Sequence, residues 1–156
     1  MAALDSRPVD APGERTAHRS PQVLSHLEMP ITSEDDVVIV RRKVRALAQA
    51  RGFDAFALAA LTTATSELTR NVWVHAGRGN AVIEELTDGQ RFGVRVTFRD
   101  EGPGIDDIER ALAGGYSTAR TMGLGLSGSR RLVDEFLLES TPGKGTLVRL
   151  IKWTRF

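Results

Sequence analysis

The sequence predicts an α+β protein, a two-layer sandwich in which helices cover one face of a mixed β-sheet. Several stretches, most clearly residues 91–99, alternate apolar and polar residues with the period of two that is typical of half-buried strands. Residues 37–47 and 58–72 instead repeat apolar residues every three or four positions, as a helix with one buried face does. Asp88-Gly89 separates two alternating stretches, where this dipeptide favours a hairpin.

The first predicted element is an edge strand over residues 23–31, because Pro30 has no backbone N–H to give to a neighbouring strand. A helix should follow, with Thr32 or Ser33 as its cap, acidic residues in its first turn and Gly52 at its end. The expected buried stripe of this helix is Val37, Val40, Val44 and Leu47.

A second and longer helix is predicted from about Asp54 to His75, with Gly77 and Gly79 ending it. The apolar residues of this segment recur at helical spacing, so one face should be buried against the sheet. That face consists of Leu58, Leu61, Thr65, Leu68 and Val72.

Two hairpins are predicted in the second half of the chain. Residues 80–86 and 91–99 should pair through the Asp-Gly turn. Strands near residues 137–140 and 146–153 should be joined by Pro142-Gly143-Lys144-Gly145.

Two short helices are expected between these hairpins. Residues 105–113 can form the first, after which a polar, small-residue segment leads to the second. The second helix should open at Gly123-Leu124-Gly125-Leu126 and turn Leu132, Val133 and Phe136 inward.

The composition limits the domain organisation and the class of protein. The chain of 156 residues, with 41% hydrophobic and 26% charged residues, fits one globular domain, and we expect residues 1–22 to be a disordered arm before a domain at 23–156. A net charge of +1 argues against a nucleic-acid partner. The absence of cysteine excludes disulfides and thiolate metal sites. The lack of cysteine suits a reducing cytoplasm, and the sequence shows no apolar run long enough for a bilayer and no secretory signal, so we expect a cytoplasmic protein.

The segment Asp100-Glu101-Gly102-Pro103-Gly104 follows the end of a predicted strand. A carboxylate at this position can accept a hydrogen bond from an exocyclic amine. Gly102 and Gly104 would let the backbone adopt positive φ and lie close under a planar ring. An ordinary turn favours the same residues, so this segment taken alone leaves both interpretations open.

Glu67 and Asn71 lie four residues apart on the second predicted helix, so their side chains share one face. An amide oxygen suits a hard cation such as Mg²⁺, and a carboxylate one turn away can accept a proton from an attacking hydroxyl. A pair of solvated side chains on an exposed helix face would show the same spacing.

The glycines of Gly123-Leu124-Gly125-Leu126-Ser127-Gly128 match a dinucleotide-binding pattern. A loop rather than a strand precedes them, and the chain that follows is too short to complete a doubly wound sheet. The exposed amides at a helix N-terminus can bind phosphate without that framework. The alternative is a flexible loop before an ordinary helix start.

These three segments, followed by Gly143-Lys144-Gly145-Thr146, occur in one order along the chain. That order resembles the GHKL ATPases, the superfamily of gyrase, heat-shock protein 90, MutL and the histidine kinases. Proteins of this superfamily have the Bergerat fold and carry such motifs in the same order. Residues 62–71, 100–105, 123–136 and 151–153 look like the RsbT serine kinases of the bacterial stressosome, relatives of the anti-sigma kinases RsbW and SpoIIAB. The resemblance runs from about residue 24 to the end of the chain.

The resemblance implies a role for each matching residue. Glu67 would be the catalytic base, Asn71 would hold Mg²⁺, and Asp100 would bind the adenine amino group of ATP. Thr146 would support the adenine end of the site. The full set of implied cofactor-binding residues is Asn71, Asp100, Gly102, Gly104, Ile105, Gly123, Leu124, Gly125, Leu126 and Thr146.

Residues 106–122 would form a lid that closes on ATP. Arg120, Arg130 and Arg131 could neutralise phosphate charge or contact a partner, and a solvated helix face explains the latter two equally well. Family members often carry Pro or Ala in the glycine box where this chain has Ser127 and Gly128, which affects turnover more than binding.

The resemblance implies an ATP- and Mg²⁺-dependent protein serine/threonine kinase that phosphorylates a STAS-domain regulator. Release from the phosphorylated regulator would free the kinase to activate a PP2C-type phosphatase in a pathway that controls a sigma factor. The alternative is a non-enzymatic partner-switching module, such as an anti-sigma factor or phosphatase activator, in which bound nucleotide only shapes a docking surface.

Overall fold

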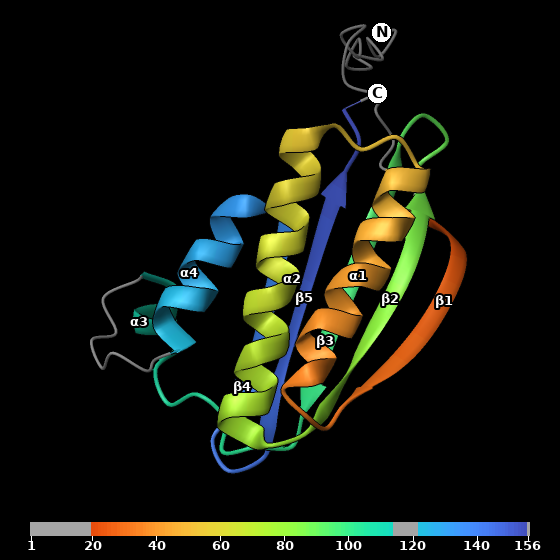
Figure 1. The fold of residues 1–156 in the computed structure, drawn as a ribbon. Coiled ribbons are helices and arrows are strands. Elements are labelled where there is room, and N and C mark those ends of the chain that lie inside the picture. Colours follow the sequence, from red (N-terminus) through yellow and green to blue (C-terminus); the bar gives the residue numbers. More distant parts are fainter. Residues whose placement is uncertain (1–19, 114–121, 156) are drawn as a thin grey trace, which may run out of the picture.

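The computed structural model describes residues 20–113 and 122–155 (Figure 1). Within these ranges the elements are, in chain order, β1 (Gln22–Ile31), α1 (Asp35–Ala50), α2 (Ala55–Ala76), β2 (Gly79–Thr87), β3 (Phe92–Asp100), α3 (Ile108–Ala113), α4 (Met122–Leu132), β4 (Glu135–Thr141) and β5 (Gly145–Trp153). The expected N-terminal arm lies outside the described residues except for its last three, of which Gln22 already belongs to β1.

The strands form one sheet in the order β1-β2-β3-β5-β4, with β1 at an edge as predicted. The α+β class is confirmed, but the expectation of a mixed sheet is wrong, because all described neighbouring strands are antiparallel. The reason is the position of β5. Strands β3 and β4 run in the same direction, but β5 forms a hairpin with β4 and lies between them, so no parallel pair is hydrogen-bonded.

The helices α1, α2 and α4 lie on one face of the sheet (Figure 1). The main hydrophobic core lies between the two layers and includes Leu61, Leu68, Val96 and Phe98. Since adjacent strand residues point to opposite faces, Ile151 points away from this core, where it joins a small second cluster with Leu86 and Trp153.

Helix α1 buries the predicted stripe at Val37, Val40 and Val44, but the expected hydroxyl cap is wrong. The carboxylate of Asp36 instead reaches back and accepts hydrogen bonds from the N–H of Thr32 at 2.8 Å and of Ser33 at 3.1 Å. The hydrogen bond from the Thr32 backbone is the main reason that the pKa of Asp36 lies below its ordinary value. An acid inside the first turn therefore satisfies the backbone before the helix.

Helix α2 agrees with the prediction at both ends and along its buried face. The Asp54 carboxylate accepts a hydrogen bond from the Ala57 N–H at 2.7 Å, and Gly77 ends the helix with φ of 76°. Buried hydroxyls do not break the helix, because they bond to carbonyls one turn back; Thr65 Oγ1 donates to the Leu61 carbonyl at 2.8 Å. A long, straight helix thus crosses the sheet and carries both Glu67 and Asn71.

Helix α4 ends at Leu132, so the expectation that Val133 and Phe136 belong to its inward face is wrong. Phe136 lies in β4, where the alternation of the strand still packs it against the main core together with Leu132 and Val133. Among the helices of residues 20–113 and 122–155, we find none that is long and apolar enough to span a membrane.

Candidate functional site

A small cavity lies where α2 and α4 meet β3 and β5. It is lined by four of the predicted site residues, each from a separate element: Asn71 from α2, Asp100 from β3, Leu126 from α4 and Thr146 from β5. The complete lining is Leu68, Asn71, Val72, Phe98, Asp100, Leu126, Thr146 and Val148. Residues that are far apart in the sequence thus converge on one space with apolar walls and a few polar groups, as in ligand sites.

Asp100 lies at the end of β3, opposite Thr146 of β5. Its Oδ1 accepts a hydrogen bond from the Gly102 N–H at 2.9 Å. Burial raises the pKa of Asp100, against the opposing effects of hydrogen bonds from the backbone of Gly102 and Thr146 and of the nearby His75. The result is a half-buried carboxyl group that is oriented by the backbone and lines the cavity.

Gly104 has the positive φ that the sequence predicts, 75°, whereas Gly102 does not, so that expectation is wrong for Gly102. Gly102 is required by space instead. A Cβ at this position would lie 2.7 Å from the Cβ of Ala76, at the end of α2. A Cβ on Gly104 would collide with the carbonyl of Thr141. Both glycines therefore let the loop after Asp100 pack against other segments, and neither lines the cavity itself.

Ile105 does not line the cavity either, but the hydroxyl group of Ser140 connects its backbone to Thr146 at the cavity. Ser140 Oγ accepts a hydrogen bond from the Ile105 N–H at 2.8 Å and lies 2.9 Å from Thr146 Oγ1. Ser140, which is in β4, was not predicted as a site residue. No local pattern indicates its role, because the role depends on the register that places it opposite Thr146.

Asn71 of α2 and Gly125 of α4 face each other. A Cβ on Gly125 would lie 3.0 Å from Asn71 Nδ2, and this amide nitrogen is buried without a hydrogen-bond partner. Turning the amide over would place its oxygen at this orphaned position, where it could bind a cation. Because no group of three or more acidic or histidine side chains in the described residues is arranged to hold a metal ion, such a cation would need ligands from a nucleotide, as Mg²⁺ commonly has. The residues present fit that arrangement.

Glu67 is one turn from Asn71, as expected, but it is not part of the cavity lining. Its side chain is 44% exposed, and Oε1 forms an ion pair with Arg70 Nη1 at 3.2 Å. His75 lies one further turn along the same face and was missed as a site residue, although its spacing of four from Asn71 was a usable signal. Burial lowers the pKa of His75, and the charge of Asp100 partly opposes this.

The first turn of α4 contains Gly123 and Leu124, as the prediction of a helix start requires. Leu126 is buried at the cavity, whereas Arg130 and Arg131 are exposed in the last turn. The expected lid at 106–122 is described only in part, at 106–113, which includes α3, and at Met122; Arg120 lies outside the described residues.

The fold and the cavity define a class of protein. Residues 31–152 match the family model of the histidine kinase-like ATPase domain, and the chain belongs to this family, which confirms the predicted superfamily and implies the use of ATP.

Within this family the chain is similar to serine/threonine-protein kinase RsbT of Bacillus subtilis (strain 168), with 42% identity over 125 residues, which are 80% of this chain and 94% of that protein. The anti-sigma F factor of Thermoanaerobacter sp. (strain X514) is 36% identical over 102 residues, which are 62% of this chain and 70% of that protein. The chain therefore belongs to the RsbT-type protein kinases, and the predicted resemblance is confirmed.

Proposed function

We propose that this protein is an ATP- and Mg²⁺-dependent kinase that phosphorylates a serine or threonine hydroxyl of a STAS-domain regulator in the cytoplasm. The observation that carries the proposal is the convergence of Asn71, Asp100 and Thr146 on one cavity, from α2, β3 and β5. The similarity to a serine/threonine-protein kinase over most of both chains supports the choice of reaction.

The adenine end of ATP would bind at Asp100. An ionised carboxylate can accept a hydrogen bond from the exocyclic amine of adenine, whereas guanine carries a carbonyl at the corresponding position. Thr146 Oγ1 is held by Ser140 and can complete this polar edge. The apolar walls at Phe98 and Val148 would contact the faces of the purine ring.

Asn71 would hold Mg²⁺ through its amide oxygen, together with phosphate oxygens of the nucleotide. When bound, Mg²⁺ would offset the negative charge on the phosphate chain during transfer. The backbone amides around Gly123, Leu124 and Gly125, in the first turn of α4, would bind the phosphates, because a helix N-terminus presents unpaired N–H groups.

Nucleotide binding requires part of the cavity wall to move. The cavity volume is about 20 Å³, which is enough for roughly one water molecule but far below the hundreds of Å³ of a typical ligand site. Gly125, in the first turn of α4, lies beside Asn71 at the side where phosphates would bind. We infer that α4 tilts so that Leu126 leaves its buried position when ATP enters, while its first turn, with Gly125, stays beside Asn71.

Glu67 would act as the base in the transfer step. The substrate hydroxyl oxygen forms a bond to the γ-phosphorus, the bond from that phosphorus to the β–γ bridging oxygen breaks, and ADP leaves. The hydroxyl proton passes to the Glu67 carboxylate. Its exposed position on α2 gives a protein substrate access, and the ion pair with Arg70 is weak enough to be exchanged for such a contact.

The partners follow from the same proposal. The STAS-domain regulator would be the substrate, and the kinase released from it would activate a PP2C-type phosphatase and so pass a signal toward a sigma factor. The similarity to both a kinase and anti-sigma F factors supports a partner-switching role of this kind.

A second candidate function is a nucleotide-gated, non-enzymatic partner-switching module. The position of Glu67 favours it, because this side chain lies outside the cavity lining and pairs with Arg70. In such a module, ATP would move α4 and change the docking surface without phosphoryl transfer.

Phosphorylation of purified STAS-domain regulators with labelled Mg²⁺-ATP distinguishes the two functions. We expect transfer by the wild type, loss of transfer with retained ATP binding in Glu67→Gln, and normal transfer in a control variant, Glu139→Gln, at an exposed position of β4. Tight, nucleotide-dependent binding of a regulator without any labelled product would instead support the non-enzymatic module.

A further inference from the structure

Ser140 of β4 forms a row with two polar residues of the cavity. The strand register places Ser140 opposite Thr146 of β5, and Thr146 opposite Asp100 of β3. Directly opposite residues of neighbouring strands point to the same face of a sheet, so the three side chains lie side by side across three strands. Asp100 and Thr146 line the cavity, whereas Ser140 does not. Ser140 can therefore act on a ligand only through its neighbours.

The Ser140 hydroxyl has three hydrogen-bond contacts, and two of them have a fixed direction. A hydroxyl group has one proton to donate and two lone pairs that accept. The Ile105 N–H can only donate, and its nitrogen lies 2.8 Å from Ser140 Oγ. The Gly145 carbonyl can only accept, and its oxygen lies 3.0 Å from Ser140 Oγ. The proton of Ser140 therefore goes to Gly145, and Ile105 takes one lone pair.

These two contacts decide the direction of the third. Thr146 Oγ1 lies 2.9 Å from Ser140 Oγ, and at this distance either hydroxyl could donate. Because Ser140 has no further proton, the Thr146 hydroxyl must donate to its remaining lone pair. The proton of Thr146 is thus committed to Ser140, and the Thr146 oxygen offers only lone pairs to a ligand in the cavity.

The carbonyl that fixes this direction is itself held in place. Gly145 has φ of 126°, which residues with a side chain rarely adopt. A Cβ at Gly145 would collide with the carbonyl oxygen of Asp100, so only glycine lets the two backbones come this close. The turn before Gly145 is closed by a hydrogen bond from the Lys144 N–H to the Thr141 carbonyl at 3.0 Å. The Gly145 carbonyl is therefore kept within reach of Ser140.

The cavity consequently presents two acceptors from neighbouring strands. An ionised Asp100 carboxylate can only accept, and Thr146 now accepts as well. The exocyclic amino group of adenine has two N–H bonds and can donate to such an edge. Hypoxanthine and guanine carry a carbonyl oxygen at the corresponding position, which would face lone pairs. A buried polar edge that one ligand satisfies and another leaves unpaired is a strong source of selectivity.

We propose that Ser140 is a positioning residue for nucleotide selectivity, which holds the Thr146 hydroxyl as an acceptor and so favours adenine over hypoxanthine and guanine nucleotides. The proposal rests on the proposed binding of ATP in this cavity and adds a residue that does not touch the ligand. Without the Ser140 hydroxyl, the Thr146 hydroxyl can rotate and donate to a carbonyl oxygen. A purely structural role of Ser140 would instead weaken all nucleotides equally.

The test compares ATP with inosine triphosphate, which carries a carbonyl in place of the amino group. Isothermal calorimetry in the presence of Mg²⁺ gives the affinity of the full-length protein for each nucleotide. We expect the wild type to prefer ATP, and Ser140→Ala to reduce the ratio of the two affinities at least about threefold, as the loss of one hydrogen bond does. Ser140→Cys fills the same space with a weak acceptor and gives the same reading should the alanine variant not fold.

Thr141→Ala is the matched control, because it removes a hydroxyl from the next position of β4. Thr141 is exposed, and its side chain points to the opposite face of the sheet from that of Ser140. This variant should keep the wild-type ratio of affinities. A ratio that falls as far in Thr141→Ala as in Ser140→Ala would contradict the proposal.

A double-mutant cycle tests whether Ser140 acts through Thr146. Thr146→Val keeps the shape of the side chain and removes its hydroxyl, so this variant should lose selectivity by itself. Adding Ser140→Ala to Thr146→Val should then change the ratio no further, because the two residues act as one unit. If Ser140→Ala lowers the ratio equally in both backgrounds, Ser140 does not work by orienting Thr146.

The same titrations separate this proposal from the proposed function. An unchanged ratio in Ser140→Ala, with both nucleotides weakened equally or not at all, would overturn the role of Ser140 and leave ATP binding intact. If the wild type binds neither nucleotide, or binds both equally well, the proposed adenine site fails and the role of Ser140 fails with it.

Discussion

Replacing Gly125 with alanine should leave the stability of the protein almost unchanged but weaken its binding of Mg²⁺-ATP. The added Cβ would lie 3.0 Å from Asn71 Nδ2 and 3.4 Å from Oδ1, so the Asn71 amide must give way by a few tenths of an ångström. Alanine favours a helix interior over glycine by about 0.8–1.0 kcal/mol, which offsets the cost of this shift. We therefore expect the free energy of unfolding to change by less than about 1 kcal/mol.

Binding should respond differently, because the displaced amide is the group that would hold Mg²⁺. A metal ligand tolerates only small displacements, so we expect Mg²⁺-ATP affinity to fall at least about tenfold, or about 1.4 kcal/mol. The fall should be smaller when ATP is titrated with a chelator in place of Mg²⁺. Isothermal calorimetry measures both affinities, and urea denaturation measures the stability of the same preparation.

Gly128→Ala is the matched control for this experiment. Gly128 lies in the same helix, but a Cβ there would have no neighbour within 4 Å. This variant should gain helix stability and keep the wild-type affinity. If Gly125→Ala binds Mg²⁺-ATP as tightly as Gly128→Ala does, Asn71 is not the metal ligand or α4 does not hold this position in the bound state, and the reasoning fails.

Three further predictions concern Asn71, Asp100 and Asp88. Asn71→Ala should remove the Mg²⁺-dependent part of ATP binding, and calorimetry with unchanged affinity would contradict this. Asp100→Asn should lower the preference for ATP over GTP. Burial raises the pKa of Asp100, so ionisation of this carboxyl group lowers the free energy of unfolding as the pH rises through that pKa. The variant, which cannot ionise there, should therefore be no less stable than the wild type at neutral pH. Hydrogen bonds from the backbone of Arg91 and Gln90 and from the Arg91 side chain lower the pKa of Asp88 to about 2. The stability that Asp88 contributes should therefore be lost as the pH falls from about 4 to 2. If the stability of Asp88→Asn falls as steeply with pH in this range as that of the wild type, Asp88 makes no such contribution.

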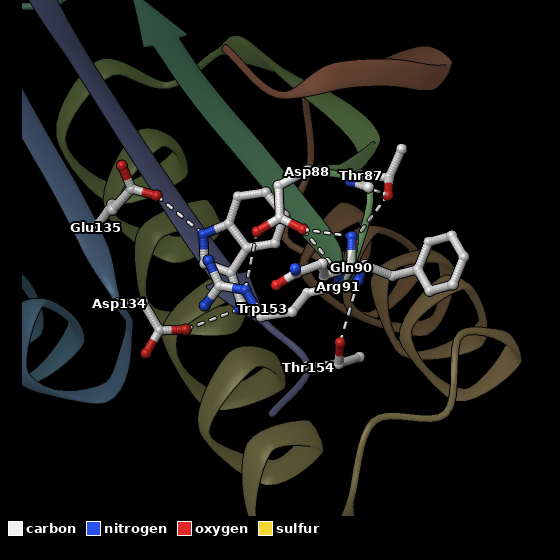
Figure 2. A network of polar contacts seen from close by, with 10 residues as sticks. Thr87, Asp88, Gln90, Arg91, Asp134, Glu135, Trp153 and Thr154 are labelled. Atoms are coloured by element: carbon white, nitrogen blue, oxygen red, sulfur yellow. Dashed lines mark hydrogen bonds and ion pairs between the residues drawn. The ribbon is translucent and has the colours of Figure 1, made fainter. Parts of the chain in front are cut away.

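Asp88 also has a structural role in its own turn. Its carboxylate organises the turn between β2 and β3 by accepting hydrogen bonds from the N–H groups of Gln90 and Arg91 at 2.9 Å and 2.7 Å. The same carboxylate holds the Arg91 side chain, whose guanidinium lies over the ring of Trp153 in β5 (Figure 2). A turn that the sequence marks only as a hairpin therefore also contacts a strand far along the chain.

Local sequence was sufficient for most of the fold. The helical spacing of Leu58 through Val72, the cap at Asp54 and the end at Gly77 all lie within α2, so residues near one another in the chain decide them. Alternation similarly located β3, and Asp88-Gly89 located its hairpin with β2. The α1 cap was misassigned because hydroxyl and acidic side chains both suit helix starts, and only the folded backbone shows which of them bonds.

The candidate site was predictable only as separate segments. Asn71, Asp100 and Leu126 each belong to a recognisable motif, and the order of the motifs indicated the family before any geometry was known. Ser140 and His75 belong to no such motif. Their positions beside Thr146 and Asp100 depend on strand register and on helix-to-sheet packing.

The sequence by itself determined the periodic helices and strands, the order of the motifs and the ATPase family, because these depend on neighbouring residues and on spacing along the chain. Only the tertiary structure decided that the sheet is wholly antiparallel among its described strands, that Asp100 faces Thr146, and that Gly125 closes against Asn71. It also decided that the Arg91 guanidinium lies over the ring of Trp153. These pairings join segments far apart in the chain, and they are set by the register and packing of whole elements, which no local pattern encodes.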